Sequence, residues 1–359
     1  MSWPLVKLKD ICRPRQWKTI AASQLLEDGY PVYGANGKIG FYSEYTHEFP
    51  TLMITCRGAT CGNVHISEPK SYINGNAMAL DELDFNRADL KYLYYFFLSR
   101  GFEDVISGSA QPQITGQGLT KVEIPLPPLP EQKRIAAILD KADAIRRKRQ
   151  QAIQLADDFL RAVFLDMFGD PVSNPKGWPK KSLRLLGKSA TGRTPPGEKG
   201  DMWGEGLPFV TPGDLCGQVD STVREVTREG AEYSKICRKG SLLVCCIGTV
   251  GKVGIAGRSL AFNQQINAQE WGSEIADIYG FFVFKLSPSL VGSKAIQTTL
   301  PILKKSLFDE IEIPVPPKGL QEKFSAIAQK VSESSLRHES GSNTPLFESL
   351  SQLAFSGKL

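Results

Sequence analysis

One phrase of this 359-residue sequence occurs twice, as VEIPLPP at residues 122–128 and as IEIPVPP at residues 311–317. Each copy leads into a charged helix start that contains glutamine, EQKRI at 131–135 and QEKF at 321–324. The repeat spacing of about 190 residues is far longer than the 20–50 residues of a solenoid unit. The sequence therefore predicts a duplicated domain, with a long helix at the end of each copy.

The repeat also predicts the domain boundaries. The first domain is expected at residues 1–122 and its helix at 123–170, and the second domain at 171–311. The final helix is expected at 312–359, with a break near 341–345, where the sequence reads GSNTP. Proline and glycine interrupt a helix, so the Pro- and Gly-rich stretch after 168 marks the joint between the copies.

Each copy is predicted to be a mixed α+β domain rich in strands. Short apolar runs alternate with Gly, Asn and Pro, for example at 50–56, 63–66, 242–247 and 252–256. Such runs are typical of strands bounded by turns. An aromatic stretch follows in each copy, at 90–98 and 278–286, and the i, i+3, i+4 spacing of the first fits a helix packed on a sheet. The fold class predicted is α+β with a pseudo-twofold internal repeat.

The two helical stretches carry apolar or small residues at alternating spacings of three and four, which is typical of a coiled coil. In the first stretch these residues are Ile135, Ile138, Ala142, Ile145, Ala152, Ala156, Phe159 and Val163. A helix of this length extends roughly 55 Å at 1.5 Å per residue. We expect the two helices to pair antiparallel and to space the two domains; the alternative is that each helix packs only on its own domain.

Composition sets broad limits. The chain has 43 Lys and Arg against 38 Asp and Glu, a net charge of +5 that permits nucleic-acid binding without proving it. The N-terminal sequence does not match a signal peptide, and the longest apolar runs are shorter than the ~18 residues that span a bilayer. The seven cysteines are interpreted as reduced thiols. These features predict a cytoplasmic protein without a membrane association.

Motifs for catalysis and metal binding do not emerge from the sequence. The segment 248–253 resembles a phosphate-binding loop, but position 246 is Cys and position 253 is Val, so the required Gly and Ser/Thr are missing. The three histidines and the cysteines lack metal-ligand spacing. There is no nucleophile elbow and no dinucleotide-binding glycine pattern. The sequence therefore predicts binding, with no catalytic residues and no metal.

Polar, glycine-rich loops remain as candidate binding elements in both copies. Their Asn, Gln, Arg, Lys, Thr and Asp side chains can contact base edges and phosphates, and glycine lets the backbone approach closely. The alternative is that these residues merely close hairpins. The candidate DNA-binding residues are Asn36, Lys38, Arg57, Thr60, Asn76, Gln111, Gln113, Thr211, Asp214, Thr249, Lys252, Asn263, Gln264 and Gln265.

Taken together, the repeat, the helical tails and the loops resemble the specificity (S) subunit of Type I restriction-modification enzymes. The most specific matches are IPLPPLPEQ at 124–132, DMFGDP at 166–171 and AFSGKL at 354–359. The resemblance covers essentially the whole chain. The second helix start departs from it, because PPKGLQE stands at 316–322 where the first copy reads PPLPEQ.

The resemblance implies a non-catalytic DNA-binding subunit of a restriction system. It implies two target recognition domains that each read half of a split site in double-stranded DNA. Two copies of a DNA methyltransferase (M) subunit would dock on the paired helices, and restriction/translocase (R) subunits would join them. S-adenosylmethionine, ATP and Mg are then expected only on those partners, where DNA methylation and restriction take place, and this chain itself needs no cofactor.

The loops of the two copies barely match, which predicts that the two half-sites differ and that the target is asymmetric. The expected rod is longer than one DNA turn of roughly 34 Å, which predicts an unspecified spacer between the half-sites. Arg57, Lys38, Lys252, Gln264 and Gln265 are the leading candidates for DNA contact. The basic run at 146–149 could touch phosphate, form a solvated face or meet an acidic partner. Two other functions remain open: a coiled-coil scaffold with two protein-binding domains, and a nucleic-acid enzyme.

Overall fold

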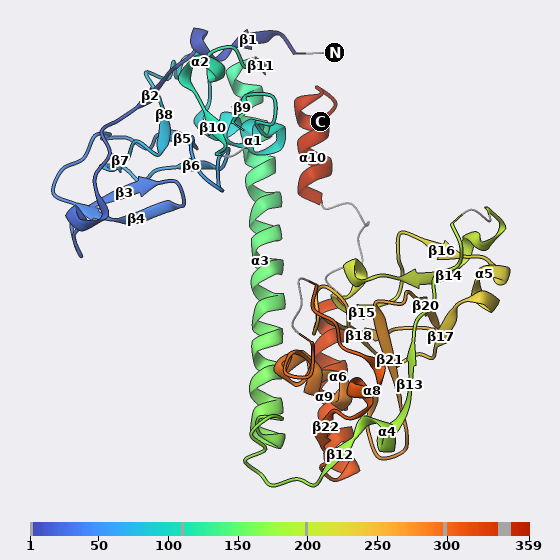
Figure 1. Ribbon diagram of the computed structural model, residues 1–359. Helices are drawn as coiled ribbons and strands as arrows, with labels where there is room; N and C mark the ends of the chain where they lie inside the picture. The colour runs from blue at the N-terminus through green and yellow to red at the C-terminus, as the bar shows by residue number, and fades with distance from the viewer. Residues whose placement is uncertain (1–2, 109–110, 198–199, 297–299, 337–345) are drawn as a thin grey trace. The chain divides into compact units, whose positions relative to one another are not determined.

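The computed structural model describes residues 3–108, 111–197, 200–296, 300–336 and 346–359. The chain divides into two compact units (Figure 1): unit 1 is Met1–Gln150 with Gly341–Leu359, and unit 2 is Gln151–Ser340. The 40-residue helix α3 (Leu129–Phe168) contributes its first part to unit 1 and its second part to unit 2. The break expected near 341–345 lies outside the described residues.

Unit 1 is built from short strands and few helices. Its four-stranded sheet has the order β2-β8-β5-β6, and a three-stranded sheet has the order β4-β3-β7. The elements are β1 (Leu5–Lys7), β2 (Arg13–Gln16), β3 (Tyr30–Gly34), β4 (Gly37–Tyr42), β5 (Leu52–Thr55), β6 (Val64–Ile66), β7 (Tyr72–Ile73), β8 (Ala77–Asp81), α1 (Leu90–Arg100), β9 (Ile106–Ser107), β10 (Gln113–Ile114), α2 (Gly116–Leu119), β11 (Glu123–Pro125) and α10 (Leu346–Phe355).

Unit 2 repeats this plan with one more strand in each sheet. Its five-stranded sheet has the order β13-β21-β18-β19-β15, and its four-stranded sheet has the order β16-β14-β20-β17. The elements are β12 (Lys180–Ser182), α4 (Leu183–Leu186), β13 (Gly187–Thr191), β14 (Trp203–Val210), β15 (Gly217–Val219), β16 (Glu225–Val226), α5 (Arg228–Tyr233), β17 (Lys235–Cys237), β18 (Leu242–Cys245), β19 (Val253–Ala256), β20 (Leu260–Phe262), β21 (Ile266–Trp271), α6 (Asp277–Leu286), α7 (Ser289–Gly292), α8 (Lys305–Asp309), β22 (Glu312–Pro314) and α9 (Lys318–Leu336). The strands expected near residues 52, 64, 242 and 253 and the helix expected near residue 90 are thereby confirmed, and the second aromatic stretch also forms a helix, α6.

The repeated phrase forms the same junction in both units. Its Glu-Ile-Pro core is a strand, β11 or β22, which pairs antiparallel with the first strand of its unit, β1 or β12. A buried glutamine follows in each helix. Gln132 accepts a hydrogen bond from the N–H of Asp89 at 2.8 Å, and Gln321 accepts one from the N–H of Ala276 at 2.8 Å. The internal repeat predicted from the sequence is therefore also a repeat of the hydrogen bonds at this junction.

The helices of each unit run antiparallel. In unit 1 the Arg146 guanidinium lies over the Phe347 ring of α10, while Arg134, earlier in α3, donates to the carbonyl of Leu359. In unit 2 the ring of Phe324, near the start of α9, lies 5.3 Å from that of Phe164, near the end of α3. The antiparallel pairing expected from the sequence is confirmed within each unit.

The predicted heptad stripe is wrong from Ile145 onward. Ile145 is 43% and Phe159 52% exposed, and the buried residues in the second part of α3 are Leu160, Phe164 and Phe168. Ala142, which is buried in unit 1, and Leu160 are about five whole turns apart at 3.6 residues per turn. On a straight helix, positions seven residues apart drift by about 20° around the axis at each repeat. The heptad pattern therefore predicted Phe159 as buried in place of the adjacent Leu160.

Candidate nucleic-acid interface

Three of the predicted loops in unit 1 meet at one place. The hydroxyl of Thr60, from the β5–β6 loop, donates to the carbonyl of Ala35 at 3.2 Å and to Oδ1 of Asn36 at 3.0 Å, both in the β3–β4 turn. The N–H of Cys56 donates to the carbonyl of Asn76, in the β7–β8 loop, at 3.0 Å. The structure thus brings together loops that are 20 to 40 residues apart in the sequence.

A fourth segment closes this cluster. The N–H of Gly58 donates to the carbonyl of Pro112 at 3.3 Å, and Arg57 forms an isolated β-bridge with Gln113. The side chains of Arg57, Gln113 and Gln111 are exposed. Lys38 lies apart from this contact set, on β4, where its ammonium pairs with Glu68 at 3.3 Å. The candidate cluster of unit 1 therefore centres on Arg57 and Gln113, with Lys38 already carrying an acidic partner.

Unit 2 assembles its loops through the same backbone bonds. The N–H of Cys246 donates to the carbonyl of Gln265 at 2.7 Å, as Cys56 does to Asn76 in unit 1. The N–H of Gly248 donates to the carbonyl of Pro301 at 3.0 Å, as Gly58 does to Pro112. The bridge of Arg57 with Gln113 likewise has its counterpart in a bridge between Ile247 and Ile302. The two loop clusters share one frame and differ in the side chains that it holds.

Several candidate side chains of unit 2 are committed to internal contacts. The ammonium of Lys252 donates to the carbonyls of Pro212 and Gly213, at 2.8 and 3.2 Å. Asp214 accepts from the N–H and the hydroxyl of Thr211, at 2.7 Å each. These contacts fix the turn after β14 against the loop before β19, so Lys252 supports the frame from within the cluster.

The β20–β21 turn divides its three candidates by exposure. Asn263 is 8% exposed and its amide donates to Oε1 of Gln265 at 3.0 Å, which makes both residues part of the turn. Gln264 is exposed and accepts from the hydroxyl of Thr194. Gln264 and the exposed Thr249 are the predicted residues of unit 2 whose side chains face solvent.

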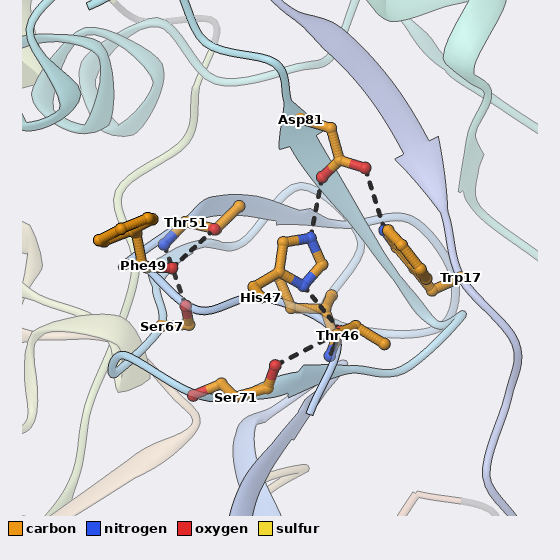
Figure 2. Close-up of polar contacts among 9 residues, drawn as sticks. Trp17, Thr46, His47, Phe49, Thr51, Ser67, Ser71 and Asp81 are labelled. Carbon is orange, nitrogen blue, oxygen red and sulfur yellow. Dashed lines mark hydrogen bonds and ion pairs between the residues drawn. The ribbon is translucent and has the colours of Figure 1, made fainter. Parts of the chain in front are cut away.

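Sequence reasoning missed a polar cluster beside the first site. Asp81 accepts from the indole N–H of Trp17 at 3.1 Å and lies 2.9 Å from Nε2 of His47 (Figure 2). Nδ1 of His47 is 2.7 Å from the hydroxyl of Thr46, which also accepts the N–H of Ile73. The order Thr-His-Asp resembles the catalytic triad of a hydrolase. Because the hydroxyl of Thr46 accepts the backbone N–H of Ile73 in β7, the cluster is interpreted as a structural support for Trp17.

The basic run at 146–149 is partly neutralised. Arg146 and Arg147 both pair with Asp143, one turn earlier in α3, at 2.7 and 3.1 Å. Lys148 and Arg149 are exposed. The three interpretations left open by the sequence stay predictions for this run.

Burial raises the pKa of Cys12, Cys237 and Cys246 to about 12, so these three thiols are poor nucleophiles at neutral pH. Among the described residues there is no group of three or more His, Cys, Asp or Glu side chains that could hold a metal ion. Within the same part of the chain, no helix is both long and apolar enough to cross a membrane.

The chain thus contains two α+β units of one design, each with the same loop frame and with antiparallel helices. Comparison with known families identifies the design: residues 2–155 and 175–344 match the model of the Type I restriction modification DNA specificity domain. The chain therefore belongs to this family, with one copy of the domain in each half. This confirms the resemblance noted in the sequence.

Individual relatives agree with this assignment. A putative type I restriction enzyme specificity subunit from Haemophilus influenzae is 20% identical over 332 residues, covering 87% of this chain and 83% of that protein. The MjaIX specificity subunit of Methanocaldococcus jannaschii is 29% identical over 161 residues, and the EcoprrI specificity subunit of Escherichia coli 29% over 143. Those two matches span 43% and 38% of this chain but only 37% and 35% of the relatives' length.

A solved structure shares the whole fold. The S subunit of a Type I restriction-modification system from M. genitalium superposes with a TM-score of 0.66 at 16% identity. The match covers 99% of this chain and 94% of that one. The α+β fold with two repeated domains and a long helix is thus the fold of a known S subunit.

Proposed function

We propose that this chain is the sequence-specific DNA-binding subunit of a Type I restriction-modification system. Unit 1 would read one half of a bipartite site in double-stranded DNA and unit 2 the other half. The observation that carries the proposal is the duplicated loop frame: equivalent backbone bonds hold Arg57 with Gln113 in one unit and Ile247 with Ile302 in the other. Side chains of such different polarity suit different base edges, so the site is asymmetric.

The chain is proposed to direct partner subunits and to catalyse no reaction itself. Two methyltransferase subunits and the restriction/translocase subunits would supply the chemistry and hold S-adenosylmethionine, ATP and Mg.

The test is methylome sequencing of cells that express the chain with its cognate methyltransferase. We expect one methylated motif in two specified parts, separated by a spacer of fixed length. Arg57→Ala should relax a position in one part only, and Gln264→Ala a position in the other part only. Gln151→Ala, at an exposed position of α3, is the matched control and should leave the motif unchanged.

Two results would overturn the proposal. If the purified chain binds random and motif-containing duplexes equally in the presence of the methyltransferase, it is a scaffold and not a reader. If the isolated chain transfers methyl groups from S-adenosylmethionine, it is an enzyme.

A further inference from the structure

An arginine stacked on an aromatic ring lies beside the loop cluster of each unit. In unit 1 the guanidinium of Arg15 lies 4.3 Å from the ring centroid of Trp17, and in unit 2 that of Arg193 lies 3.8 Å from the ring of Tyr233. Both arginines are exposed. Cation–π stacking holds the planar group against the ring and leaves its N–H edge free for an anion.

The Trp17 platform is held on several sides. Asp81 accepts from its indole N–H at 3.1 Å, and the ring of His47 packs edge-on against it with centroids 5.1 Å apart (Figure 2). Trp17 directly follows β2 and stands two residues after Arg15, whose guanidinium lies over its ring. An arginine placed on so fixed a ring needs little ordering when it binds.

Each platform adjoins the equivalent loop of its unit. Gln16, next to Arg15, donates to the carbonyl of Gly75 at 3.0 Å. The backbone of Trp17 passes close to Gly75. A Cβ on residue 75 would lie 2.5 Å from the carbonyl oxygen of Trp17, so this position requires glycine. In unit 2 the N–H of Arg193 donates to the carbonyl of Phe262 at 3.0 Å, directly before the Asn263–Gln265 turn.

Neither charge is compensated within the described part of the chain. The arginine–carboxylate ion pairs found there involve other arginines. One of these is Arg13, which lies on the same strand as Arg15 and pairs with Glu82 at 3.5 Å. A preorganised, unpaired guanidinium beside a base-reading loop suits a phosphate oxygen, to which it can bind in a bidentate manner.

We propose that Arg15 on Trp17 and Arg193 on Tyr233 are phosphate clamps. Each would fix the DNA backbone at its half-site and so set the register in which the neighbouring loop meets the bases. This inference rests on the proposed function. Trp17 and Tyr233 are positioning residues that act through the stacked arginine.

The test is fluorescence anisotropy of the full chain with a duplex over a range of salt concentrations, for motif and random sequences. Arg15→Gln should lower the slope of log K against log salt by about 0.9, which corresponds to about fivefold weaker binding at 0.15 M salt. The loss should be equal for both sequences, because a phosphate contact reads no base. Arg193→Gln should produce the same loss in unit 2.

Two matched variants separate a clamp from general charge. Arg13→Gln removes a charge from the same strand, but one already paired with Glu82, so its slope should change by less than half as much. Trp17→Leu should weaken binding about two- to fivefold when Arg15 is present, which is the worth of an exposed cation–π contact. It should have no further effect in the Arg15→Gln background, a coupling that a purely structural role would not produce.

The outcomes distinguish this inference from the function on which it rests. A wild-type chain that prefers its motif, with an Arg15→Gln variant of unchanged salt slope, refutes the clamp and leaves the function standing. Equal slope losses for Arg13→Gln and Arg15→Gln, or additive effects of Trp17→Leu and Arg15→Gln, also refute it. A wild-type chain that binds no duplex removes both proposals.

Discussion

Replacing Gln132 by methionine should selectively destabilise unit 1. Gln132 is fully buried and joins three backbone groups: Oε1 accepts the N–H of Asp89 at 2.8 Å, and Nε2 donates to the carbonyls of Arg87 and Pro127, at 2.7 and 2.8 Å. Methionine fills nearly the same volume, so the cavity contribution is small. The change therefore isolates the hydrogen bonds that connect the α1 start to the α3 start.

The magnitude follows from the exposure of the three groups. Pro127 is buried, so its unpaired carbonyl costs about 1–3 kcal/mol, whereas the half-buried N–H of Asp89 costs about 1 kcal/mol. Water can replace the partner of the carbonyl of Arg87, which belongs to an exposed residue. The sum is about 2–4 kcal/mol of unfolding free energy. Gln321→Met should cost unit 2 about the same, since Gln321 makes the equivalent three bonds.

The assay is pulsed hydrogen exchange with mass spectrometry across a urea titration, because peptides report the two units separately. Gln132→Met should lower the unfolding midpoint of unit 1 peptides, and Gln321→Met that of unit 2 peptides. Gln151→Met, at an exposed position of α3, should change either unit by no more than about 0.5 kcal/mol. If Gln132→Met costs no more than this control, the three bonds do not hold the junction and the reasoning is wrong.

Three further predictions concern single side chains. Arg57→Ala should cost about 1–3 kcal/mol of DNA binding and relax one base position, as measured by competition with single-base variants of the methylated motif. Maleimide at pH 8 should label the exposed Cys216 in the folded chain and spare Cys246, whose pKa burial raises to about 12, as peptide mass spectrometry can determine. The N–H of Ser173 lowers the pKa of Asp170, so the stabilisation it gives is complete above the unfolded-state pKa of about 4 and is lost as the pH falls through the lower folded-state value. Asp170→Asn should therefore destabilise unit 2 at pH 6 more than at pH 3, as urea titrations at the two pH values can measure.

The fold was largely predictable because its signals are local. The VEIPLPP phrase, the apolar runs and the helical spacing each lie within a few neighbouring residues, and the strands β5, β6, β18 and β19 formed where they were expected. The exposure of Phe159 was not predictable by heptad counting, since a seven-residue repeat drifts around a straight helix over the length of α3.

The candidate site was predictable only as a set of loops. Lys252 resembled a free DNA contact in sequence, but the carbonyls that bind its ammonium belong to Pro212 and Gly213, about 40 residues earlier. Trp17 and Asp81 are 64 residues apart, so no local pattern indicates that they meet. Contacts between residues far apart in the sequence decide which polar side chains remain free to contact DNA. Local sequence patterns do not indicate these contacts.

The asymmetry proposed for the target is compatible with a loop frame that is the same in both units. The bonds from Gly58 to Pro112 and from Gly248 to Pro301 use backbone groups only, and both glycines have a positive φ, 88° and 83°, that favours glycine. The neighbouring side chains can therefore change without cost to the frame, and they differ at the equivalent pair, Arg57 in unit 1 and Ile247 in unit 2. A guanidinium can bind a guanine edge in a bidentate manner, whereas an aliphatic side chain suits a thymine methyl group. A duplicated domain with such a division of roles can acquire two specificities while it keeps one fold.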